Sequence, residues 1–245
     1  MKLYFEYFSC LRRLGRGLFF FFLSVISFLS YASVSPYSQE ASRIIEESRN
    51  ALGRRDYGLL KNKGEQLKQL GKIHSNINEE TVGNAIMLYG LICMRDTTDF
   101  TPHIKNLIKY APVIRENDTK GYGIVANTLS SYYQKILNDF PNALHYATES
   151  LNAFKDIGDK SHEALTLSNI ASIYLLRNDT TGETYGHQSY NLAKEIKDST
   201  VVYIASCNLA NFEYLKGAYD NARNYIIEAG KIADKKKPSI WKELS

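Results

Sequence analysis

Small residues recur on apolar stretches of this chain at a spacing of about 40 residues. In the clearest copy, Ala210 lies in a first apolar stretch, Gly217 marks a short loop, and Ala222 and Ala229 lie in a second stretch. An earlier copy places Ala171 at the position equivalent to Ala210. Self-similarity at this period predicts a solenoid, in which each unit buries its apolar face against its neighbours.

The apolar pattern has helical spacing and predicts five helical hairpins. We expect them over residues 38–75, 78–116, 119–157, 161–196 and 199–233. Their loops are expected near residues 53–55, 96–98, 138–139 and 178–182 and at Gly217. Asn78 and Ser161 are expected N-caps, and residues 198–200 offer several more, because short polar side chains satisfy the free N–H groups of a first turn. The sequence has no alternating strand pattern, so we expect an all-α fold.

The first 32 residues have the layout of a secretory signal peptide. Basic residues precede a 13-residue apolar run over residues 17–29, and Ser30 and Ala32 supply the small residues of a cleavage site. The run is short for a membrane-spanning helix, which needs about 20 residues. An uncleaved N-terminal anchor is the alternative, because the run can extend to Val34. No cysteine lies directly after the run, since the next one is Cys93, which argues against a lipid anchor.

The net charge depends strongly on this segment. The whole chain has 30 basic and 26 acidic residues, and residues 1–32 hold four of the basic and one of the acidic ones. The remainder, residues 33–245, therefore carries a net charge of +1. We expect no nucleic-acid binding, which requires clustered basic residues on one face. The basic run at residues 235–237 is interpreted as a complement to a helix dipole.

Motifs for cofactor binding and for metal binding are incomplete in this sequence. Residues 121–126 fit a G-x-G-x-x-A dinucleotide pattern, but a helix and not a strand precedes them, so we expect Gly121 and Gly123 to shape a turn between repeats. His162 and Glu163 begin an H-E-x-x-H motif, yet position 166 is threonine. Cys93 and Cys207 lie on different units and are interpreted as small buried residues. We expect no catalytic residue, no cofactor and no metal site.

The repeats resemble tetratricopeptide repeats (TPRs) of the long bacterial type, with small residues at fixed places in both helices. The resemblance covers residues 80–235. The small residues that carry it are Gly90, Ser130, Ala171 and Ala210 in first helices, and Ala143, Ala147, Ser150, Gly186, Ala193, Ala222 and Ala229 in second helices. It implies a right-handed α-solenoid of about five antiparallel hairpins. In the first unit, Ser48 is the best equivalent.

A signal peptide followed by such repeats is similar to the exported N-terminal half of TPR regulators from Bacteroidetes. The resemblance implies a periplasmic location, or an inner-membrane anchor that leaves the repeats facing the periplasm. The repeat domain is expected over residues 33–236. Residues 237–245 are expected to be a tail or the start of an incomplete further helix. No second apolar segment or output domain follows, so we expect no signalling through the membrane by this chain alone.

The first helices of TPR hairpins line a concave groove, and the alignment places uncharged hydrogen-bonding side chains there. The candidate groove residues are Asn127, Ser131, Gln134, Ser168, Ser172, Asn211 and Tyr214. Such groups suit a peptide backbone, because amides and hydroxyls both donate and accept hydrogen bonds. The alternative is that they are ordinary solvated helix faces. The basic clamp for a terminal carboxylate is missing, since the matching positions hold Asn127, Ser168 and Cys207.

The expected function is a non-catalytic scaffold or sensory module that binds a protein or peptide in the groove. The alternative is a membrane-tethered fragment of a TPR-containing transcriptional regulator or sensor that binds a small molecule or glycan. Three loops, at residues 96–98, 179–181 and 198–200, resemble the short Asp-Ser/Thr sequences that Bacteroidetes glycosylate on exported proteins. Ordinary helix capping explains the same three loops equally well.

Overall fold

The computed structural model describes residues 35–96 and 99–235 of the chain. Within these ranges it forms ten α-helices and no β-strand, which confirms the all-α expectation there. The chain divides after Pro36, and the helices belong to the unit that begins at Tyr37. The expected signal peptide or anchor at residues 1–32 and the expected tail at 237–245 lie outside the described residues.

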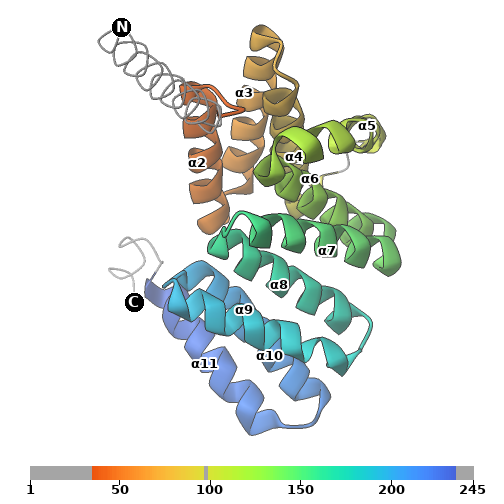
Figure 1. Cartoon of the computed structure of the whole chain (residues 1–245). Helices are drawn as coiled ribbons and strands as arrows, with labels where there is room; N and C mark the ends of the chain where they lie inside the picture. Colours follow the sequence, from red (N-terminus) through yellow and green to blue (C-terminus); the bar gives the residue numbers. More distant parts are fainter. Residues whose placement is uncertain (1–34, 97–98, 236–245) are drawn as a thin grey trace, which may run out of the picture. The chain divides into compact units, whose positions relative to one another are not determined.

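Each helix packs against the next one along the chain (Figure 1). Two short segments extend the series: a π-helix, η1, continues α6, and a 3₁₀ turn, η2, precedes α9. The elements are α2 (Gln39–Gly53), α3 (Tyr57–His74), α4 (Ile77–Met94), α5 (Thr101–Asn117), α6 (Thr119–Tyr132), η1 (Tyr133–Leu137), α7 (Phe140–Asp156), α8 (Lys160–Leu176), η2 (Thr180–Gly182), α9 (Glu183–Glu195), α10 (Ser199–Leu215) and α11 (Tyr219–Lys235).

The helices begin at short polar side chains that accept hydrogen bonds from the first turn. The N-cap of α4 is Asn76 and that of α8 is Asp159, so the expectation of Asn78 and Ser161 is wrong by two residues. Both expected residues already lie inside the first turn of their helix. Of the three candidates at residues 198–200, Asp198 caps α10.

The small residues that define the repeat are buried where the helices meet. Serine, alanine and glycine at these positions allow close approach, because a larger side chain would separate the helices. The prediction of their burial is confirmed for Ser48, Gly90, Ser130, Ala143, Ala147, Ser150, Ala171, Gly186, Ala193, Ala210, Ala222 and Ala229.

The beginning of the helical unit is tied to α4 by a buried carboxylate. Glu79 is fully buried, and its Oε1 accepts the backbone N–H of Ser38 at 2.8 Å. His74 Nδ1 lies 2.8 Å from Glu79 Oε2. A buried carboxyl group is stable only when it is hydrogen-bonded, and these two contacts meet that need. The start of α2 is therefore held against α4.

Candidate functional site

The first helices of the hairpins surround a hollow of about 700 Å³. Residues of α2, α4, α8 and α10 line it, together with the first residue of α3 and the π-helical continuation of α6. The hollow combines basic side chains, amides and hydroxyls with an aromatic and aliphatic wall. Its lining is Glu46, Arg49, Asn50, Leu52, Gly53, Arg54, Arg55, Tyr57, Tyr89, Cys93, Gln134, Lys135, Ser161, His162, Leu165, Ser168, Asn169, Ser172, Asp198, Thr200, Val201, Ile204 and Asn208.

Three of the candidate groove residues line this hollow. Gln134 Nε2 donates to Ser172 Oγ at 3.2 Å, which links η1 to α8. Ser168 accepts two hydrogen bonds from Asn208 Nδ2, at 2.9 Å on its carbonyl oxygen and 3.0 Å on Oγ, which link α8 to α10. These side chains therefore hold neighbouring hairpins together as well as facing the hollow.

The other four candidate residues lie elsewhere. Asn127 lines an adjoining crevice and accepts a hydrogen bond from Asn169 Nδ2 at 2.8 Å. Ser131 is buried, with 3% of its surface exposed. Asn211 and Tyr214 are exposed on the last turns of α10 and are not part of the lining of the hollow. The structure therefore does not bring all seven candidate residues to one site.

The π-helical segment η1 brings Gln134 and Lys135 to the hollow. A π-turn adds a residue to the helical repeat and thereby rotates the side chains that follow, and such turns are frequent at functional sites. The segment ends at Asn138, which has a left-handed backbone with φ of 54°. Nothing in the sequence pattern separates this turn from an ordinary α-helix end, so it was not predicted.

Tyr89 and Cys93 form a neutral wall on α4. Burial raises the pKa of Tyr89 well above its ordinary value, and the neighbouring Cys93 and Tyr57 raise it further. Burial also raises the pKa of the Cys93 thiol, although Lys135 acts in the opposite direction. Lys135 Nζ lies 3.8 Å from Cys93 Sγ. Both groups are therefore neutral near pH 7. Cys93 and Cys207 are free thiols that are half-buried and not fully buried.

Basic side chains at the hollow are the main feature that the sequence analysis missed. Arg49, Arg54 and Arg55 come from the end of α2 and the loop after it, and Lys135 comes from η1. The expected groove was uncharged, because the alignment covered only first-helix positions of the third to fifth units and left out the first unit, which contains residues 49, 54 and 55. The pair at residues 54–55 is visible in the sequence as the loop of the first hairpin, but its approach to α10 is a tertiary contact.

The loop of the first hairpin reaches the fifth hairpin beside the hollow. Thr200 Oγ1 donates to the carbonyl oxygen of Gly53 at 3.3 Å, across 147 positions of sequence. The Arg55 guanidinium lies 4.3 Å from the centre of the Tyr203 ring, within the range of a cation–π contact. The hollow is therefore bounded by both ends of the helical series.

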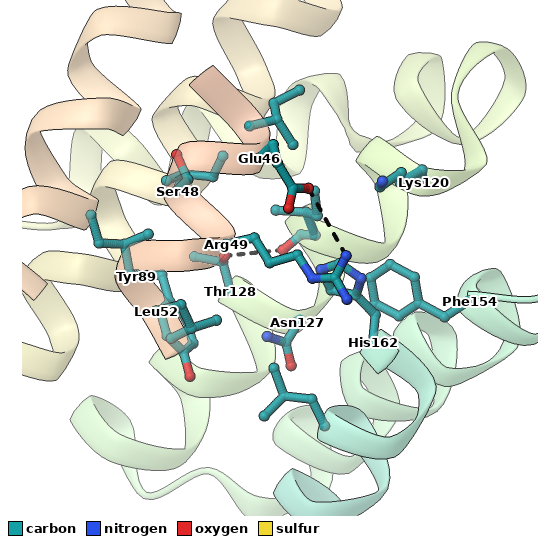
Figure 2. A pocket seen from close by; sticks show the side chains of 15 residues that line it. Glu46, Ser48, Arg49, Leu52, Tyr89, Lys120, Asn127, Thr128, Phe154 and His162 are labelled. Carbon is teal, nitrogen blue, oxygen red and sulfur yellow. Dashed lines mark hydrogen bonds and ion pairs between the residues drawn. The ribbon is translucent and has the colours of Figure 1, made fainter. Parts of the chain in front are cut away.

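A narrow crevice of about 70 Å³ adjoins the hollow. Figure 2 shows the Arg49 side chain extending from α2 towards His162 and Phe154, with Glu46 beside its guanidinium. The His162 ring stacks on Phe154 with centroids 4.7 Å apart. A space of this size holds only water, since ligand pockets measure about 300–1,000 Å³.

His162 is tied to the N-cap of its own helix. Its Nδ1 lies 2.8 Å from Asp159 Oδ2. Burial alone would raise the pKa of Asp159, but hydrogen bonding and charge from His162, together with Lys120, hold it below its ordinary value. The histidine has a structural pairing and an aromatic neighbour, which gives it a packing role in α8.

The glycines of the G-x-G-x-x-A pattern lie in the first turns of α6 and not in a turn between repeats, so that expectation is wrong. A Cβ atom at Gly123 would lie 2.7 Å from the Phe154 ring, so this glycine allows α7 to approach. In the part of the chain that the structure describes, no three His, Cys, Asp or Glu residues are grouped to hold a metal ion. No helix among the described residues is both long and apolar enough to cross a bilayer.

No family model matches the chain, and no curated protein matches its sequence. Among solved structures, the crystal structure of BtubC (BKLC) from P. vanneervenii is similar, with a TM-score of 0.56. The sequences are 15% identical, and the match covers 80% of this chain and 89% of that chain. A likeness at this identity shows a shared helical fold and carries no function across.

Proposed function

We propose that this chain is a non-catalytic binding module, a TPR-like right-handed solenoid that holds a protein or peptide in its hollow. The observation that supports the proposal is a hollow of about 700 Å³ to which the first-helix layer of all five hairpins contributes. Repeat proteins use such concave surfaces to bind partners, and their extended shape supplies many weak contacts in place of one deep site.

The chemistry of the lining suits a polypeptide. Asn50, Gln134, Asn169 and Asn208 contribute carboxamides to the lining, and in the last three the amide nitrogen already donates to a neighbouring helix. Tyr57 adds an aromatic surface. A peptide backbone offers both a donor and an acceptor at each residue, so amide side chains match it without requiring a particular sequence. The charged side chains that line the hollow would supply the preference for particular peptide sequences.

The cellular role follows from the N-terminal layout in the sequence. We propose that the module is exported and acts in the periplasm, as a scaffold or as the sensory part of a signalling protein. If residues 1–32 are retained, they anchor it to the inner membrane. Near-zero net charge over residues 33–245 supports a protein partner over a nucleic acid.

The size of the hollow supports one second candidate. A volume of about 700 Å³ lies within the range of about 300–1,000 Å³ that encloses a small ligand. A membrane-tethered fragment of a TPR-containing regulator could use the same space for a small molecule or a glycan fragment. Binding of this kind would raise the melting temperature of the purified chain when the ligand is added.

Site-specific photo-crosslinking in cells tests the main proposal. A photo-crosslinking amino acid replaces Ser172, which lines the hollow, and Lys155 serves as the matched control because it is exposed on α7. We expect a protein adduct from the probe at position 172 and none from the probe at position 155. Equal adducts at both positions, or none at either, would contradict a partner bound in the hollow.

A further inference from the structure

Three basic side chains at the hollow have no acidic partner within the described part of the chain. Arg54, Arg55 and Lys135 line the hollow, and none of them forms an ion pair there. Some basic side chains on other surfaces are paired, as for Arg115 with Glu149 at 2.9 Å and Lys194 with Glu228 at 3.0 Å, whereas these three gather around one hollow without an ion pair. The hollow therefore concentrates positive charge that the protein does not neutralise.

The two carboxylates that line the hollow already interact with other groups of the protein. Glu46 lies 3.9 Å from the Arg49 guanidinium. Asp198 caps α10 through Oδ1, and its Oδ2 accepts a hydrogen bond from Ser161 Oγ at 3.0 Å. A cap carboxylate is committed to the backbone of its helix and does not turn towards a distant cation. Neither carboxylate is therefore available to Arg54, Arg55 or Lys135.

Two of these cations are positioned by aromatic rings. Arg55 lies over Tyr203, and Lys135 Nζ lies 5.6 Å from the centre of the Tyr89 ring. An aromatic face attracts a cation and restricts where it sits, but it carries no net charge and leaves the positive charge uncompensated. Restricting a side chain before binding reduces the entropy that binding must overcome. The arrangement therefore resembles a preorganised anion site.

We propose that the hollow binds an acidic peptide segment, with side-chain carboxylates held by Arg54, Arg55 and Lys135 at the rim. The segment's backbone lies against the amides and hydroxyls of the lining. Arginine suits carboxylates because its planar guanidinium can donate two parallel hydrogen bonds. The proposal rests on the proposed peptide-binding function. It does not require a terminal carboxylate, because residues within a segment supply the charge.

A displayed library of random peptides with blocked C-termini tests the proposal. The purified chain from residue 33 onward selects from this library. We expect selected peptides to be enriched in Asp and Glu relative to the starting library. Selection of peptides without such enrichment would overturn the acidic specificity and leave the peptide-binding function standing. Selection of no peptide at all would count against the peptide-binding function itself.

Charge-reversal variants test whether the acidic peptide binds at the basic side chains of the hollow. In Arg54→Glu/Lys135→Glu, we expect affinity for a selected acidic peptide to fall by at least about tenfold, since like charges across an interface repel. The control, Arg223→Glu/Lys155→Glu, changes the net charge equally at exposed positions of α11 and α7 outside the lining. Affinity should stay within about twofold in the control. Equal losses in both variants would show that only the net charge of the protein matters and would overturn the site.

A further experiment with free anions distinguishes an acidic peptide from a small anionic molecule as the ligand of the hollow. Citrate and inorganic phosphate are added to the purified chain, and the melting temperature is followed. The proposal predicts little stabilisation by either anion at concentrations where a selected acidic peptide stabilises the chain. Stabilisation by citrate or phosphate, lost in Arg54→Glu/Lys135→Glu and accompanied by no selected peptide, would assign the hollow to a small anion and overturn the acidic segment.

Discussion

Two kinds of helix–helix contact in this molecule bring the backbones close together, and they use different small residues to do so. Between α3 and α4 the contact is made by Gly64 and Gly71 on one helix and by Gly83 and Gly90 on the other. Glycines seven residues apart lie on the same helix face. A Cβ atom at Gly71 would lie 2.2 Å from the backbone nitrogen of Glu80, so only glycine fits there.

The glycine contact joins two successive hairpins, whereas serine makes the close contact between the two helices of the third and of the fourth hairpin. Ser150 Oγ donates to the carbonyl oxygen of Gly123 at 2.9 Å, which joins α7 to α6. Ser189 Oγ donates to the carbonyl oxygen of Ala164 at 2.7 Å, which joins α9 to α8. The serine is small enough for close packing and also supplies a hydrogen bond between the helices.

The difference shows that one geometric requirement has two chemical solutions. Glycine gives the shortest distance between helix axes, but it loses more conformational freedom on folding than any other residue. Serine keeps the helices slightly further apart and gains a buried hydrogen bond, worth about 1 kcal/mol. The glycine contact should therefore tolerate no added atom, whereas the serine contact should tolerate the loss of its hydroxyl.

The largest effect is expected at the glycine contact. Gly71→Ala should lower the free energy of unfolding by about 3 kcal/mol, because the backbone atoms that the new methyl group meets cannot move aside. Urea denaturation measures the loss. The control is Gly230→Ala on α11, where nothing lies within 4 Å of an added Cβ atom. That change should be neutral or stabilise by about 0.5–1 kcal/mol. Equal stabilities of the two variants would show that the glycine contact between α3 and α4 is not sterically constrained.

A polar contact on another face of α4 should rank second. Asn84 has 2% of its surface exposed, donates to His103 O at 3.3 Å and Asn106 Oδ1 at 3.2 Å, and lies 2.7 Å from His103 Nδ1. Asn84→Ala removes these three interactions of a buried side chain and should cost about 2 kcal/mol in urea denaturation. Asn152→Ala, at an exposed position of α7, is the control and should cost less than about 0.5 kcal/mol.

The serine contact should respond more weakly. Ser150→Ala removes the hydrogen bond to Gly123 without creating a clash, so we expect a loss of about 1 kcal/mol in the free energy of unfolding. Ser42→Ala, at an exposed position of α2, should change it by less than about 0.5 kcal/mol. A loss at Ser150 as large as that at Gly71 would mean that the two contacts are under the same steric constraint.

The smallest effect, and one that depends on pH, is expected at the cap of α8. Asp159→Asn keeps a capping oxygen but removes the charge that pairs with His162. Because the folded-state pKa of Asp159 lies below its ordinary value of 3.8, the ionised form stabilises the fold above that value. This contribution is lost as the pH falls through the folded-state pKa.

Urea denaturation at about pH 7 and about pH 3 measures this contribution. The difference in stability between the original chain and Asp159→Asn should be larger at the higher pH. Asp56→Asn is the control, because Asp56 is an exposed N-cap that accepts from Leu59 and has no histidine beside it. A difference of the same size at both pH values would contradict the role of the Asp159 charge.

Much of the helical fold could be predicted from local pattern. The loop at Gly217 separates α10 from α11, and the N-cap of α10 lies within residues 198–200, as expected. Local signals succeed here because caps and glycine turns act within a few residues. The glycine contact of α3 and α4 was missed in part, since only Gly90 was included among the repeat positions. The seven-residue spacing of Gly64 and Gly71, and of Gly83 and Gly90, was a signal that could have revealed it.

The candidate site could be predicted only in part. Gln134, Ser168 and Ser172 line the hollow, whereas Asn211 and Tyr214 do not. The alignment assigned a face to each first helix but could not say how far along the helix the hollow extends. That limit depends on how successive hairpins rotate against one another, and rotation is set by packing between units.

The sequence by itself determined the helices, their order and the small residues at their contacts, because these depend on periodicity and on steric rules within a few turns. Only the tertiary structure decided that the loop at residues 53–55 reaches α10 and that Lys135 joins it at the hollow. Contacts across 147 positions depend on the summed geometry of every intervening helix pair, which no local pattern encodes. The helices and their order could therefore be predicted from the sequence, whereas the positive charge of the hollow could not.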